Sequence, residues 1–91
     1  MRKRAYKGKL KETEKRYVEK RCMNLDADGR QDLLKACFAV DEDIAVELFL
    51  SLFANLSYDR LLGVIYIPIN RGDFYAARRN VCEKMLELWN E

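Results

Sequence analysis

Apolar residues recur at helical spacing along most of the chain, and clusters of turn-forming residues separate the apolar runs. This spacing predicts helices over residues 9–23, 30–40, 43–54, 58–63 and 70–89. The third of these is the most apolar, with a wide hydrophobic face made by Ile44, Leu48, Phe49, Leu52 and Phe53. We therefore expect an all-α fold, a small helical domain of about five helices.

One segment has a different pattern. Residues 64–69, Val-Ile-Tyr-Ile-Pro-Ile, have the composition of a strand. A single strand would find no partner elsewhere in this sequence, so we interpret the segment as a buried turn between helices. The strand remains the alternative interpretation.

Two residues are well suited to begin the last two helices. Ser57 is a natural N-cap for residues 58–63, whose buried side chains would be Leu61 and Leu62. Asn70 can cap the last helix, with Asp73 at its N3 position. Both helices should therefore have well-defined starts.

The last helix carries two apolar strips. The first is the predicted core strip, made by Phe74, Ala77, Val81, Met85 and Leu88. The second is made by Cys82, Leu86 and Trp89. One strip would suffice for an internal core, so the second forms either a homodimer contact or a contact with the N-terminal helix.

Length and composition describe one ordinary globular domain over residues 1–91, with 49% apolar and 35% charged residues. No apolar run is long enough to span a bilayer. The basic start Met1-Arg-Lys-Arg continues into lysines and glutamates, which is unlike a secretory signal. We expect a cytoplasmic protein without a membrane partner.

The three cysteines and the absence of histidine argue against metal binding and catalysis. Cys22, Cys37 and Cys82 show no Cys-x-x-Cys spacing, so we expect packing residues in a reducing compartment and no metal site. Without histidine the commonest general base is missing, and the chain has no glycine-rich phosphate loop. We expect neither enzymatic activity nor a cofactor.

The loop beginning at Asn24 shares part of the spacing of a calcium-binding EF-hand. Asn24, Asp26, Asp28 and Gly29 fall at the first, third, fifth and sixth positions of such a loop. The twelfth position, which needs a bidentate glutamate, is Lys35. The better interpretation is that Asp28 or its neighbour caps the next helix.

Charge is distributed unevenly. Residues 1–24 hold ten Lys and Arg against three Glu, whereas residues 25–91 hold seven basic against twelve acidic residues. A basic N-terminal arm or helix is suited to contacting a polyanion through its phosphates. A solvated helix surface explains the same charges equally well.

The order of the last three elements, helix, short helix and longer helix, matches a helix-turn-helix unit. Leu56-Ser57-Tyr58-Asp59-Arg60-Leu61 resembles the Leu-Ser-Tyr-Glu-Glu-Ile start of the short helix in sigma-70 region-4-like proteins. Ile69-Asn-Arg-Gly-Asp-Phe-Tyr75, followed by Arg78-Arg79, resembles the opening of their recognition helix. Residues 44–89 thus resemble small regulators of this type carried by phages and mobile elements of Gram-positive bacteria.

Three departures from this family pattern are visible. The interval from Tyr58 to Asn70 is about two residues longer than the common turn, and Pro68 replaces the usual glycine. Ala76 and Ala77 stand where basic residues are frequent.

The resemblance implies a dimeric DNA-binding transcriptional regulator that reads the major groove with the helix 70–89. Arg71 and Tyr75 would contact base edges, because arginine pairs bidentately with guanine. The implied phosphate contacts are Arg78, Arg79, Ser57 and Arg60.

Two other functions remain open. A small protein-interaction module, such as a phage-encoded inhibitor or adaptor, would use the acidic body or the Cys82, Leu86 and Trp89 strip. The acidic balance of residues 25–91 favours this alternative, since DNA-reading domains are usually basic. The third function is RNA binding through the basic arm with Tyr6 and Tyr17.

Overall fold

The computed structural model describes residues 10–90, and all the regular structure in this range is helical. The helices are α1 (Glu12–Cys22), α2 (Ala27–Val40), α3 (Ala45–Phe53), α4 (Tyr58–Leu62) and α5 (Arg71–Trp89), with a short 3-10 helix, η1 (Glu42–Ile44), before α3. The predicted all-α fold with five α-helices is confirmed. Residues 1–9 of the predicted basic arm lie outside the described residues.

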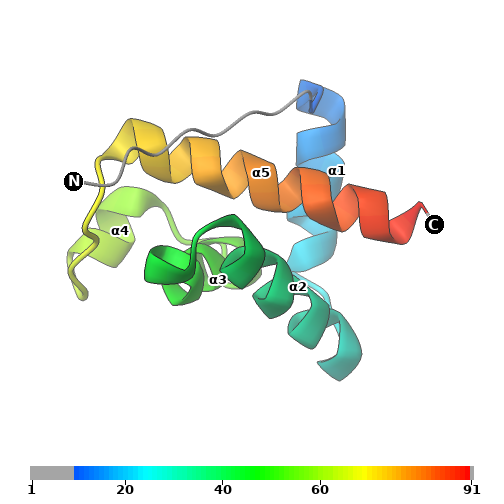
Figure 1. The fold of residues 1–91 in the computed structure, drawn as a ribbon, viewed down its shortest axis with the longest axis horizontal. Coiled ribbons are helices and arrows are strands. Elements are labelled where there is room, and N and C mark those ends of the chain that lie inside the picture. The colour runs from blue at the N-terminus through cyan, green and yellow to red at the C-terminus, as the bar shows by residue number, and fades with distance from the viewer. Residues whose placement is uncertain (1–9, 91) are drawn as a thin grey trace.

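The helices are arranged around the long C-terminal helix (Figure 1). Helix α5 runs across one side of the molecule, and both α2 and α3 pack against it. Helix α1 crosses the C-terminal half of α5, and the short α4 lies near its beginning. The first turns of α5 therefore neighbour α4, whereas the later turns neighbour α1.

The core combines side chains from every helix. Phe74 is its largest fully buried side chain and has no exposed surface, as its place in the predicted core strip requires, whereas Leu88, predicted for the same strip, is 41% exposed. Helices α2, η1 and α3 contribute Leu33, Ile44, Leu48 and Leu52, and helices α1 and α5 contribute Val18, Val81 and Met85. The core is thus one continuous cluster, and α5 supplies one of its walls.

Side-chain caps fix the starts of three helices. The Ser57 hydroxyl accepts the backbone N–H of Arg60 at 3.2 Å, and the Asn70 amide oxygen accepts that of Asp73 at 2.8 Å, which confirms both predicted caps. The prediction for α2 was wrong in detail. Asp26, not Asp28, is its cap and accepts the Gly29 N–H at 2.8 Å, so α2 begins at Ala27 instead of residue 30.

The segment 64–69 contains turns and bends but no strand, which confirms a turn between helices, but the predicted burial was wrong for Val64 and Tyr66, whose side chains are exposed. Ile67 and Ile69 point into the core and are buried. Leu62, predicted to be buried, is 44% exposed, because α4 ends there and Leu61 alone occupies the core position. The connection is therefore anchored by Ile67 and Ile69, and Ile65 packs partly buried against the core, whereas Val64 and Tyr66 stay exposed.

The second apolar strip of α5 is used within the chain. Cys82 is fully buried, and the Trp89 ring packs edge-on against Tyr17 of α1 with 6.2 Å between centroids. The Arg21 guanidinium lies 4.0 Å from the centroid of the same Trp89 ring. Contact with the N-terminal helix is thus the observed role of Trp89.

All three cysteines are free and buried, which confirms their interpretation as packing residues. Burial removes water from the thiols and so disfavours the thiolate form. It raises the pKa of Cys22 to about 11 and the pKa of Cys37 and of Cys82 to about 12.

These raised pKa values predict a loss of stability at alkaline pH. Above pH 9.0, the ordinary pKa of the thiol, the unfolded chain loses thiol protons that the folded chain keeps. The free energy of unfolding should therefore fall as pH rises from about 9 toward 12, by about 1 kcal/mol for each thiol at about pH 10. Urea unfolding of wild type and Cys37→Ala at about pH 8 and about pH 10 measures this, and the variant should lose about 1 kcal/mol less than wild type. An identical pH dependence in both proteins would contradict the prediction.

Within residues 10–90, no helix combines the length and the apolarity that crossing a bilayer requires.

Candidate nucleic-acid interface

Aromatic side chains fix α4 on the first turns of α5. The Phe74 ring lies 5.4 Å from that of Tyr58 and 5.8 Å from that of Tyr75, centroid to centroid. The Tyr58 backbone N–H donates to the Tyr75 hydroxyl at 3.1 Å, and the Tyr58 hydroxyl donates to the Ile69 carbonyl at 2.7 Å. These contacts hold α4, the connection and α5 in one arrangement.

One face of α5 presents a row of large polar side chains. Arg71, Tyr75 and Arg79 are spaced at intervals of four residues, so they lie on the same side of the helix. Tyr75 is 38% exposed, and the side chains of Arg71 and Arg79 are 62% and 44% exposed. The opposite face, with Phe74, Ala77 and Val81, is fully buried. We call the exposed residues Arg71, Tyr75 and Arg79 the α5 row.

The predicted site residues of α4 lie at the beginning of this row. Ser57 and Arg60 are exposed, and Arg71 donates to Asp59 of α4 at 2.5 Å. Because this ion pair is largely solvated, it contributes little to stability and leaves Arg71 able to change partners. Ser57, Arg60, Arg71 and Tyr75 are therefore gathered at one end of the molecule.

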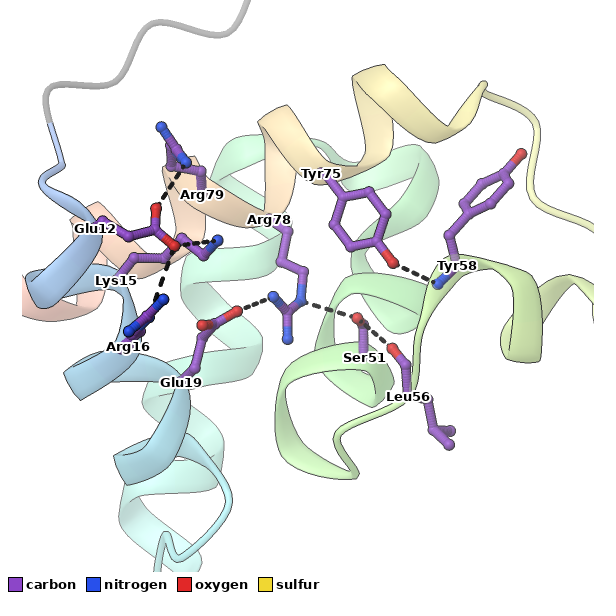
Figure 2. Close-up of polar contacts among 10 residues, drawn as sticks. All are labelled: Glu12, Lys15, Arg16, Glu19, Ser51, Leu56, Tyr58, Tyr75, Arg78 and Arg79. Carbon is purple, nitrogen blue, oxygen red and sulfur yellow. Dashed lines mark hydrogen bonds and ion pairs between the residues drawn. The ribbon is translucent and has the colours of Figure 1, made fainter.

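Arg78 does not join the α5 row (Figure 2). Its guanidinium points between α1 and α3, where it forms an ion pair with Glu19 and donates from Nε to the Ser51 hydroxyl at 3.0 Å. Ser51, itself buried, donates to the Leu56 carbonyl at 2.7 Å. With only 12% of its side chain exposed, Arg78 links three parts of the fold and is poorly placed to hold a phosphate.

Arg79 and α1 together form a second charged group around Glu12. The Glu12 carboxylate lies 3.4 Å from Lys15, 3.9 Å from Arg16 and 3.5 Å from Arg79 (Figure 2). Two of these cations come from its own helix and one from α5. We call Glu12, Lys15, Arg16 and Arg79 the Glu12 cluster, and its cations outnumber its single carboxylate.

The contribution of α1 was missed by the sequence interpretation of the site. Glu12, Lys15, Arg16 and Glu19 lie on one face of a helix, and this spacing was the available signal. The same spacing also fits an exposed helix with internal ion pairs. Only the crossing of α1 over α5 shows that this face meets Arg78 and Arg79.

Neither a metal nor a similar protein offers an independent guide to function. Among residues 10–90, no three His, Cys, Asp or Glu side chains gather in a way that could hold a metal ion. We compared the chain with known protein families, curated proteins and solved structures, and none of them matched. We therefore infer the function from the geometry of the chain itself.

Proposed function

We propose that the chain binds double-stranded DNA with the α5 row, in the manner of a helix-turn-helix regulator. The observation that carries the proposal is the row itself, with Arg71, Tyr75 and Arg79 exposed along the first half of a capped helix. The first turns of such a helix fit the major groove, where arginine and other polar side chains reach base edges. The Tyr58 backbone N–H of α4 donates to the Tyr75 hydroxyl of these turns, which supports assigning α4, in this proposal, the role of the helix that precedes the recognition helix.

The proposed roles follow from position. Arg71 and Tyr75, nearest the helix start, contact base edges, and Arg71 exchanges its solvated pair with Asp59 for a guanine. Arg79, Ser57 and Arg60 contact phosphates on either side of the groove. Arg78 positions α1 and α3 instead of contacting DNA, which revises its role in the sequence-based hypothesis.

Fluorescence anisotropy with a labelled mixed-sequence duplex, at low and at moderate salt, tests the proposal. Binding should weaken as salt rises, because phosphate contacts release counterions. The double substitution Arg60→Ala/Arg71→Ala should weaken binding by about tenfold or more, the effect of losing one base contact and one phosphate contact.

The matched control is Lys35→Ala/Lys84→Ala, which removes the same charge from exposed positions on α2 and on the later part of α5. An equal loss of affinity in both double variants would mean that only net charge matters. The proposal would also fail if no duplex binding occurred at low salt.

One observation favours protein binding as a second candidate function. Val64 and Tyr66, in the connection before α5, are 80% and 82% exposed, and Leu62 beside them is 44% exposed. Exposed apolar side chains gathered on one loop are characteristic of contact surfaces. If duplex binding is absent, and sedimentation shows a self-association that Val64→Ser/Tyr66→Ser abolishes, protein binding takes precedence over DNA binding.

A further inference from the structure

A hollow lies between α1 and α5, beside the Glu12 cluster. It has a volume of about 350 Å³ and is lined by Lys15, Tyr75, Ala76, Arg78, Arg79 and Cys82. Three of these six residues are cations, and Lys15 and Arg79 are the same side chains that surround Glu12. The hollow therefore has a cationic lining and one aromatic wall.

The two carboxylates near the hollow do not neutralise it. Within residues 10–90, the four cations Lys15, Arg16, Arg78 and Arg79 form ion pairs with two carboxylates, those of Glu12 and Glu19. Arg78 is held on two sides by Glu19 and Ser51, so its positive charge is fixed in place beside the hollow. The guanidinium itself stays engaged with Glu19 and Ser51, so Arg78 adds to the positive potential of the hollow without being a direct ligand.

We propose that this hollow binds a phosphate group carried by an organic molecule, with Lys15 and Arg79 as its direct ligands. The two side chains would exchange their exposed contacts with Glu12 for charge-assisted hydrogen bonds to phosphate oxygens. The volume falls within the range of small-molecule sites and exceeds that of a phosphate ion alone. Tyr75 and Ala76 supply the surface for the remainder of the ligand. The phosphate belongs either to a free mononucleotide-sized compound or to a DNA strand, and only the second case rests on the proposed function.

Glu12 distinguishes this site from a purely structural cluster. As an internal competitor for Lys15 and Arg79, it should weaken ligand binding, so Glu12→Gln should tighten it by about threefold. Lys15→Ala/Arg79→Ala should weaken it by about tenfold. Glu87→Gln, at an exposed position on α5 outside the hollow, is the charge-matched control and should leave affinity within about twofold of wild type.

Titrations followed by NMR chemical shifts of the backbone amides, at constant ionic strength, provide the test. The probes are inorganic phosphate, adenosine 5′-monophosphate and the mixed-sequence duplex. A free ligand is supported if the affinity for adenosine 5′-monophosphate exceeds that for inorganic phosphate, is raised by Glu12→Gln and is lowered by Lys15→Ala/Arg79→Ala. A DNA phosphate is supported if only the affinity for the duplex responds to these variants, in the same order.

The outcome that overturns the site is independent of the proposed function. If none of the three probes responds to Glu12→Gln or to Lys15→Ala/Arg79→Ala, the hollow is not a phosphate site. This holds even if Arg60→Ala/Arg71→Ala weakens duplex binding, because those two residues lie outside the lining of the hollow. If, conversely, the variants change nucleotide affinity while no duplex binding occurs at all, that result supports the phosphate site and contradicts the DNA proposal.

Discussion

Replacing Arg78 by alanine is expected to lower the free energy of unfolding by about 3 kcal/mol, because the substitution leaves a partly buried carboxylate unpaired. Only 23% of the Glu19 side chain is exposed, so water cannot fully replace the guanidinium. The Ser51 hydroxyl loses the Nε–H donor that lies 3.0 Å away. Urea unfolding followed by circular dichroism measures the difference between variant and wild type.

A double-mutant cycle separates the ion pair from other effects of truncating Arg78. Glu19→Ala combined with Arg78→Ala should cost much less than the sum of the single substitutions, because the double variant contains no unpaired charge. Arg16→Ala, which breaks an exposed pair with Glu12, should change stability by less than about 0.5 kcal/mol. If Arg78→Ala were as mild as Arg16→Ala, the link between α1, α3 and α5 would not be a stabilising contact.

Truncating Phe74 to alanine is expected to destabilise the fold by about 4 kcal/mol, since the ring is fully buried and a cavity would remain. The ring also contacts Tyr58 and Tyr75, so its loss removes the packing that seats α4 on α5. Equilibrium unfolding in urea measures the difference in the free energy of unfolding between Phe74→Ala and wild type. Because so little stability would remain, Phe74→Ala should show a much lower midpoint or no folded baseline.

Phe74→Leu is the companion to this variant. Leucine keeps most of the apolar volume, so the expected cost is roughly 1 to 2 kcal/mol and the fold should persist. A loss below about 1 kcal/mol in Phe74→Ala would contradict the central position of this ring.

Local signals in the sequence were sufficient to predict most of the fold. Apolar spacing predicted the helices. Ser57 and Asn70 predicted the starts of α4 and α5, because their capping bonds reach only three residues along the chain. Leu62 shows where this reasoning failed. In a helix of only five residues the spacing pattern is too short to distinguish its buried from its exposed side.

The candidate site was harder to predict, because it depends on contacts between distant parts of the chain. Arg78 and Arg79 are equivalent in the sequence, both basic and adjacent in a predicted recognition helix. Their environments diverge through partners that lie 59 and 67 residues away, Glu19 and Glu12. No local pattern specifies which of two neighbouring arginines will be buried, so a phosphate contact was predicted for both.

The crossing of α1 over α5 has a consequence for the order in which the chain acquires its structure. Among the described helices α1 is synthesised first, yet Arg78 and Trp89, which hold α1 in place, belong to α5, the last of them. Until then α1 is a short helix with solvated charges, which is marginal in water by itself. Docking of α1 therefore follows the synthesis of α5, and it closes most of residues 10–90 into a single loop.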